Sequence, residues 1–130
     1  MSTIFTKIVQ GEIPSYKIAE DDRYYAFLDI HPLAQGHTLV IPKQETDYLF
    51  DLDDDLLAGM MVFSKRVARA IEKVVSCKRI GVAVLGLEVP HAHIHLIPIN
   101  SEADISFSRP KLQLTDEEFR ALAQKIREAL

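Results

Sequence analysis

Cysteine is nearly absent from this chain of 130 residues, in which Cys77 stands alone. A disulfide framework and a Cys-x-x-Cys zinc site are therefore excluded, and we expect the protein to work in a reducing cytoplasm. Tryptophan is absent as well. No apolar run approaches the roughly 20 residues that a membrane-spanning helix needs, and the first residues lack the apolar centre of a secretory signal. We therefore expect no membrane partner.

Positive charge is also scarce, since 15 Lys and Arg face 19 Asp and Glu and give a net charge of −4. Binding of DNA or RNA depends on dense contacts between basic side chains and phosphates, so we exclude nucleic acid as the main partner. Apolar residues, by contrast, make up 48% of the chain. That share can fill one core at this length, and we expect residues 1–130 to form a single domain.

Short apolar segments bounded by turn residues predict an antiparallel sheet. Residues 16–21 and 23–30 fit two strands of a hairpin, and residues 37–43 fit a third strand. Residues 79–89 are apolar on both faces, which is typical of a central strand that is covered on each side.

Helical spacing of apolar residues predicts a long helix within residues 51–76 and a terminal helix over 115–130, with a short helical piece at 3–9. Thr115 and Glu118 form the pattern of a capping box. The apolar surface of the long helix is wider than one stripe, which indicates burial against the sheet and against a second subunit. We therefore predict an α+β fold, an antiparallel sheet with one long and one C-terminal helix, and a homodimer.

Three of the five histidines stand at alternate positions in His-Ala-His-Ile-His, residues 91–95. Alternate side chains of a strand share a face, so we expect His91, His93 and His95 to line one face. A packed core explains them poorly, because six ring nitrogens would need partners. A His-x-His pair can chelate zinc, and a neutral imidazole can attack phosphorus. The residues alone favour neither metal binding nor catalysis.

Residues 91–97 fit the pattern His-φ-His-φ-His-φ-φ, where φ is apolar, and resemble the histidine triad (HIT) family of nucleotide hydrolases and transferases. Residues 4–22, residues 26–43 and the long helix are similar to the same family in the same order. The resemblance spans residues 3–98. It implies a HIT-like fold and catalysis on a small nucleotide without a cofactor or a bound metal, because the zinc-binding cysteines of some relatives are absent.

The resemblance also implies a role for each candidate residue. His93 matches the histidine that attacks the α-phosphorus to give a nucleotidyl-histidine, and His95 matches the one that contacts the phosphate and the leaving group. His91 and His37 match supporting histidines, and Asp29 matches the acid that binds the ribose hydroxyls. The other nucleotide-binding candidates are Ile30, Phe5, Ile8, Glu88 and Val89. For the first three of these, a plain core role is an open alternative.

Two positions depart from the family pattern. Ile80 and Leu87 stand where many members carry amide side chains that bond the phosphate, so backbone N–H groups of residues 87–89 would have to substitute. We expect a phosphoramidase-like hydrolase of nucleoside 5′-phosphate derivatives, either phosphoramidates or nucleotidyl conjugates. The alternatives are a dinucleoside polyphosphate hydrolase, a nucleotide-binding module with weak catalysis, and a histidine-ligated metal protein.

Overall fold

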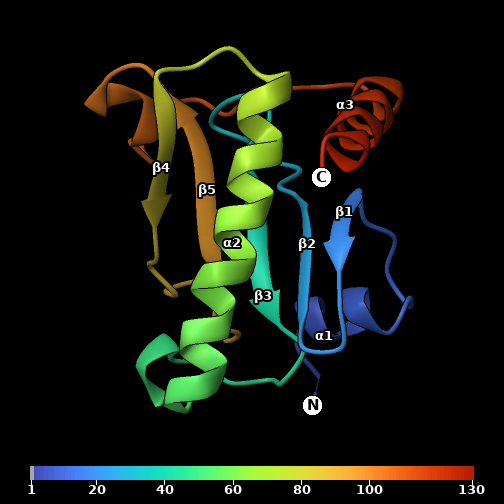
Figure 1. The fold of residues 1–130 in the computed structure, drawn as a ribbon, viewed down its shortest axis with the longest axis vertical. Coiled ribbons are helices and arrows are strands. Elements are labelled where there is room, and N and C mark those ends of the chain that lie inside the picture. Colours follow the sequence, from blue (N-terminus) through green and yellow to red (C-terminus); the bar gives the residue numbers. More distant parts are fainter. Residues whose placement is uncertain (1) are drawn as a thin grey trace.

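The computed structural model describes residues 2–130, and its centre is a five-stranded antiparallel sheet with the strand order β1-β2-β3-β5-β4 (Figure 1). The strands are β1 (Lys17–Glu20), β2 (Tyr24–Leu28), β3 (Thr38–Pro42), β4 (Arg79–Ala83) and β5 (Ile94–Ile99). The helices are α1 (Ile4–Val9), α2 (Asp54–Val74) and α3 (Asp116–Glu128), with short 3-10 turns at Leu49–Asp51 and Glu102–Ile105. The predicted α+β fold, with its antiparallel sheet, one long helix and one C-terminal helix, is confirmed.

The long helix α2 covers one face of the sheet (Figure 1). It begins where the carboxylate of Asp53 accepts a hydrogen bond from the Leu56 N–H at 2.8 Å, which satisfies one free donor of the first turn. One side of the helix packs into the main core, and its fully or nearly fully buried residues are Met60, Phe63, Val67, Ala70 and Ile71. Among the described residues, no helix combines the length and the apolarity that crossing a bilayer requires.

The C-terminal helix α3 extends the same layer, because it packs against α2 and β1. Its capping box is formed as predicted: the Thr115 hydroxyl accepts from the Glu118 N–H, and the Glu118 carboxylate accepts from the Thr115 N–H. The helix therefore begins at a fixed point at the end of the long connection that follows β5.

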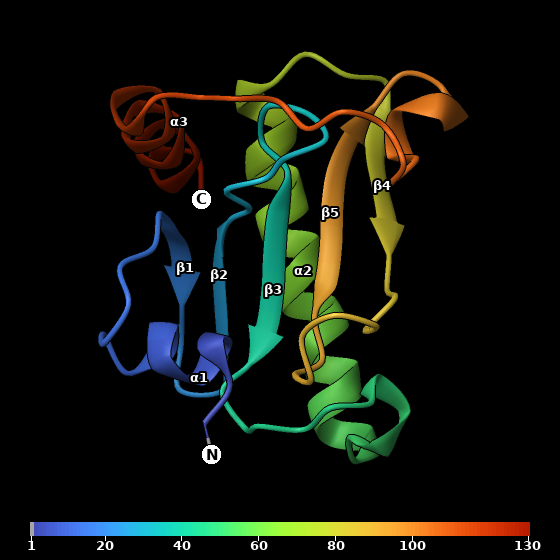
Figure 2. The same cartoon turned by 180° about the vertical axis from the view of Figure 1, so that it is seen from behind.

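The opposite face of the sheet carries α1 and a smaller apolar cluster (Figure 2). The buried members of this cluster are Phe5, Ile8, Tyr25, Phe27, Leu39 and Ile41. Leu39 of β3 lies opposite His95 of β5 in the ladder, and directly opposed residues share a face. The histidines therefore project from the face that α1 occupies, away from α2.

The prediction for residues 79–89 is wrong in its position within the sheet. Only Arg79–Ala83 forms a strand, β4, which is one of the two outer strands of the sheet and pairs with β5 alone. Several apolar side chains of residues 79–89 lie in solvent: Val82 of β4 is 51% exposed, and Leu87, beyond the strand, is 89% exposed. An apolar pattern on both faces therefore marks an edge strand here: Ile80 packs against the main core beneath α2, whereas Val82 stays exposed.

Candidate active site

The histidine segment approaches the sheet along a different path from the one predicted. The strand β5 begins at Ile94, so His91 and His93 precede it in an irregular segment and only His95 lies within the ladder. The rings of His93 and His95 are 5.0 Å apart, and His37 comes within 5.2 Å of His95 from the loop before β3. The ring of His91 instead forms its hydrogen bonds with Thr3 and Pro42, so three rings on one strand face is a correct description only in part.

His93 has one ring nitrogen, Nε2, that carries a free lone pair and faces solvent. Its Nδ1–H donates to the backbone oxygen of His91 at 2.7 Å, and a neutral ring then has its lone pair on Nε2. Within residues 2–130, His93 Nε2 has no hydrogen-bond partner, yet no buried side-chain nitrogen or oxygen lacks one. His93 Nε2 is therefore open to solvent, as a nucleophile must be.

His37 and His95 form a relay whose direction a backbone amide sets. The Leu33 N–H donates to His37 Nδ1 at 2.9 Å, so His37 carries its proton on Nε2. That Nε2–H lies 2.9 Å from His95 Nδ1 and donates to it. His95 consequently holds its own proton on Nε2. Burial lowers the pKa of His37 to about 3 and that of His95 to about 4, which keeps both rings neutral at physiological pH.

His91 is fully buried and has both ring nitrogens engaged. Its Nε2–H donates to the backbone oxygen of Pro42 at 2.8 Å, and its Nδ1 accepts from the Thr3 hydroxyl at 2.8 Å. Burial lowers the pKa of this ring as well. His91 therefore acts on its surroundings as a neutral, fixed group, and its backbone oxygen is the one that orients His93.

Asp29 lies at the end of β2, beside His37. The His31 N–H donates to its Oδ1 at 2.8 Å, and Oδ2 lies 3.5 Å from His37 Nε2. Burial raises the pKa of this carboxyl. Its neighbour Ile30 is 58% exposed, so an apolar side chain open to solvent follows the carboxylate in the sequence.

The other nucleotide-binding candidates lie in unlike surroundings. Phe5 and Ile8 are buried in the smaller cluster, and Phe5 also meets His93 edge-on with ring centroids 5.1 Å apart. Val89 is half-buried against the same cluster, whereas Glu88 is exposed. The structure brings Phe5 to the triad and leaves Glu88 pointing at solvent.

Ile80 lies on the far side of the sheet from the histidines. It pairs with Pro98, whereas Ala83 is the β4 residue opposite His95, and residues at odd spacing along a strand face opposite ways. Ile80 packs instead against the main core beneath α2. Its replacement of a polar residue therefore has no direct bearing on groups that bind at the triad.

Several site residues have no recognisable pattern in the sequence. Phe107, from the connection after β5, meets His95 edge-on at 4.8 Å and His37 at 6.3 Å. The Leu33 amide and the Pro42 oxygen are backbone groups, which no residue type reveals. Thr3 has one local signal, because a threonine before a helical segment is a common N-cap.

The hydrogen bonds of His37 and His91 oppose metal binding by these two rings. Ligand atoms of Asp29, His37 and His95 lie within 4.8 Å of one another. The Leu33 amide, however, occupies His37 Nδ1 and so places a proton on the Nε2 that would have to bind the ion. His91 is no better, because both of its nitrogens already have partners.

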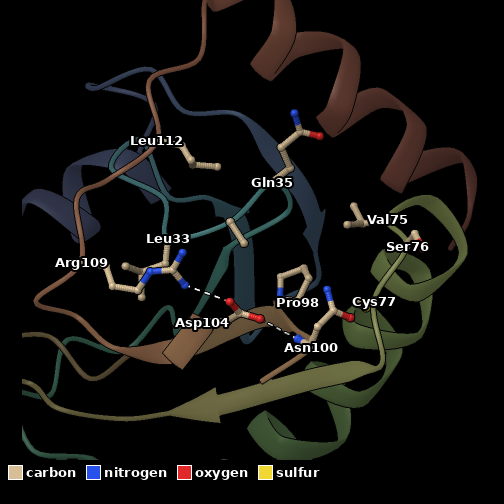
Figure 3. Close-up of a pocket in the computed structure, with 11 residues that line it drawn as sticks. Leu33, Gln35, Val75, Ser76, Cys77, Pro98, Asn100, Asp104, Arg109 and Leu112 are labelled. Atoms are coloured by element: carbon tan, nitrogen blue, oxygen red, sulfur yellow. Dashed lines mark hydrogen bonds and ion pairs between the residues drawn. The ribbon is translucent and has the colours of Figure 1, made fainter. Parts of the chain in front are cut away.

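A shallow pocket of about 280 Å³ adjoins the loop that carries His37 (Figure 3). Leu33 and Gln35 line it from that loop, and Cys77 and Asn100 line its far side. Its Arg109 guanidinium lies 2.9 Å from the Asp104 carboxylate. The pocket thus contains an internal ion pair and none of the four histidines, so the chemistry of the site lies outside it.

Comparison with known proteins agrees with this arrangement. Residues 10–102 match the HIT domain family. An uncharacterized HIT-like protein of Borreliella burgdorferi is 39% identical over 95% of this chain and 94% of its own length. The adenosine 5′-monophosphoramidase hnt1 of Schizosaccharomyces pombe is 38% identical over 97% of this chain and 96% of its own. A crystal structure of a Hit-like protein involved in cell-cycle regulation from Bartonella henselae superposes with a TM-score of 0.86 at 34% identity, covering 99% of this chain and 96% of that one.

Proposed function

The chain belongs to the histidine triad (HIT) family, and from that premise we propose that it hydrolyses nucleoside 5′-phosphoramidates and related nucleotidyl conjugates at the α-phosphorus. One observation carries the proposal: the rings of His93 and His95 lie 5.0 Å apart, and their Nε2 atoms differ in protonation. Nε2 of His93 has a free lone pair, whereas Nε2 of His95 carries a proton. The full-length similarity to an adenosine 5′-monophosphoramidase supports the substrate class.

In the first step, His93 Nε2 attacks the α-phosphorus and forms a P–N bond to the ring. The bond from phosphorus to the leaving nitrogen breaks, and that nitrogen departs as the amine with a proton taken from solvent. His95 Nε2–H donates a hydrogen bond to the phosphoryl group while its negative charge is rearranged, which is the kind of fixed dipole that lowers such barriers. Two smaller barriers replace one large barrier.

In the second step, water attacks the phosphorus and gives up a proton to solvent, the bond to His93 breaks, and the nucleoside monophosphate is released. Asp29 accepts hydrogen bonds from the two ribose hydroxyls, since its Oδ2 has only a long 3.5 Å approach to His37. Ile30 and Phe5 flank the base. The ring of Phe107 excludes water from the buried side of His95.

The test is the release of AMP from adenosine 5′-phosphoramidate by the purified protein. We expect turnover by the wild type and its loss in His93→Ala, while His31→Ala, which changes an exposed histidine, is a matched control that retains activity. With substrate labelled at the α-phosphorus and a rapid alkaline quench, label should appear on the wild type and not on His93→Ala.

Other outcomes would select other functions. If the wild type binds AMP but neither variant nor wild type turns over, the protein is a nucleotide-binding module. If diadenosine polyphosphates are cleaved and the phosphoramidate is not, the substrate class proposed above is wrong.

We also propose that the protein acts as a homodimer in the cytoplasm, where its half-buried thiol of Cys77 stays reduced. The proposal is supported by the exposed apolar side chains on β4 and on the outer side of α2. The exposed residues of these two elements are Met61, Val62 and Val82. An outer strand with free backbone groups and apolar side chains is a ready site for a second chain.

The dimer is tested by light scattering during size-exclusion chromatography. We expect a mass twice the 14.7 kDa of one chain. Val82→Asp should lower the mass to that of the monomer. Glu72→Gln, which changes an exposed residue of α2, should leave the mass unchanged. A monomeric wild type at micromolar concentration would contradict the proposal.

A further inference from the structure

The amino-terminal end of α1 reaches the triad through one hydroxyl group. Thr3 caps the helix, because its Oγ1 accepts from the Thr6 N–H at 3.1 Å. The same Oγ1 lies 2.8 Å from His91 Nδ1, across 88 positions of sequence. In Figure 2, α1 lies at the end of the sheet where β3 finishes. Thr3 lies outside the part of the chain that matches the HIT domain, which begins at residue 10.

A carboxylate from the loop after β3 holds Thr3 in place. Glu45 Oε1 accepts from the Thr3 N–H at 2.7 Å and from the Thr6 hydroxyl at 2.6 Å. These two hydrogen bonds lower the pKa of Glu45, so this carboxylate is an anion under ordinary conditions. The helix start, the loop and the buried ring of His91 are thus joined in one network.

The hydrogen bonds of His91 determine which of its ring nitrogens carries the proton. His91 Nε2 faces the oxygen of Pro42, which can only accept, so Nε2 carries the proton and Nδ1 must accept. The Thr3 hydroxyl is therefore the donor to Nδ1. Thr6 gives its own hydroxyl proton to Glu45. The Thr6 oxygen is a second acceptor for the Thr3 hydroxyl, but at 3.2 Å it is farther away than His91 Nδ1 at 2.8 Å. Without Thr3, a fully buried nitrogen would have no donor at ideal distance, since Thr6 Oγ1 lies 3.5 Å away.

We propose that Thr3 and Glu45 are positioning residues for the reaction: they fix the ring and backbone of His91, whose oxygen orients the nucleophile His93. The effect on turnover rests on the proposed function. The physical path is short, because the His91 oxygen accepts from His93 Nδ1 at 2.7 Å. A shift of His91 moves that oxygen and turns His93 Nε2 away from the phosphorus.

Five variants separate positioning from simple stability. Thr3→Val keeps the shape but removes both the cap and the donor to His91, and Thr3→Ser keeps both. Thr115→Val is the matched control, since it removes the equivalent threonine cap from α3. Glu45→Ala removes the anchor of Thr3, and its control is Gln44→Ala, an exposed neighbour that bonds only the Thr46 hydroxyl among the described residues.

We expect Thr3→Val to lower kcat roughly 10- to 100-fold, with KM changed less than about twofold, as for the loss of a partner that orients an active-site ligand. Thr3→Ser should restore most of the activity, and Glu45→Ala should lie between. Thr115→Val and Gln44→Ala should turn over like the wild type.

The nitrogen NMR shifts of the His91 ring test the network independently of turnover. In the wild type, Nε2 should be protonated and Nδ1 should show the shift of a hydrogen-bonded acceptor. In Thr3→Val that shift should move toward the value of a free nitrogen, and in Thr3→Ser it should not. If the wild type fails to cleave the phosphoramidate, the proposed function fails while these ring shifts still decide the placement of protons. A wild-type kcat in Thr3→Val, equal losses in Thr3→Val and Thr115→Val, or a protonated His91 Nδ1 would overturn the proposal.

Discussion

Acidification from pH 7 to pH 5 should destabilise the protein through its buried histidines. The pKa of His37 falls from 6.5 in the unfolded chain to about 3, and that of His95 from 6.5 to about 4. Between pH 6.5 and pH 4 the unfolded chain therefore binds more protons than the folded one, so the free energy of unfolding falls as the pH falls. Their contribution to stability is complete above pH 6.5 and is lost downward through the folded pKa values.

The magnitude follows from the width of this window. Between pH 7 and pH 5, each ring should lower the free energy of unfolding by about 2 kcal/mol, or by about 4 kcal/mol for the two rings together. Both side chains are buried, with 1% and 7% exposure for His37 and His95, so solvent screening reduces this little. The lowered pKa of His91 acts in the same direction, and the raised pKa of Asp29 opposes it. A loss of about 4 kcal/mol is a large part of the 5–15 kcal/mol that holds a typical domain together.

Urea unfolding followed by far-ultraviolet circular dichroism at half-unit steps of pH measures this loss. His95→Asn keeps an acceptor for His37 Nε2–H and removes one titrating ring, so the loss from pH 7 to pH 5 should fall to about half. His31→Asn changes an exposed ring and should leave the loss unchanged. A wild type that loses less than about 1 kcal/mol, or a His95→Asn variant with the wild-type slope, would refute the reasoning.

Three further outcomes are expected. Tyr24→Phe should cost about 1–2 kcal/mol in urea unfolding, because the buried hydroxyl donates to the Leu56 oxygen at 2.7 Å. Gly59→Ala should cost more, since a Cβ there would collide with the same hydroxyl, and the double variant should be more stable than the sum of the two losses predicts. Phe107→Ala should admit water to His95, raise the pKa of that ring toward its ordinary value, and so flatten the acid-induced loss of stability between pH 7 and pH 5.

Much of the fold follows from patterns that are local in the sequence. The strands at β1, β2 and β3, the caps at Asp53 and Thr115 and the two main helices all depend on neighbours within a few residues. The place of β4 in the sheet does not. Apolar residues on both faces predict cover on both faces, but the pattern cannot say whether the cover comes from this chain or from another one.

Sequence patterns predict less of the site than of the fold. Alternating histidines predict a shared strand face, yet Pro90 precedes the segment and the ladder starts only at Ile94. Thr3 and Glu45 are 42 positions apart, and Thr3 and His91 are 88 apart. Contacts over such distances are created by the tertiary fold. The resemblance to HIT proteins gathers His37 and Asp29 around the triad, but it does not give the partners that fix each ring.

Those hydrogen-bond partners determine which nitrogen of each histidine carries the proton, and so give four similar side chains different chemical properties. An isolated neutral imidazole has two tautomers, and either nitrogen can carry the proton. Here the Leu33 amide, the Pro42 oxygen and the His91 oxygen each remove that freedom from one ring. His95 inherits its tautomer from His37, so one amide in a loop decides which face of His95 offers a proton. Because these are backbone groups, a substitution that shifts the loop of Leu33 without touching a histidine should exchange donor for acceptor at His95 Nε2. The reactivity of the triad is therefore a property of the fold around it as much as of the histidine pattern itself.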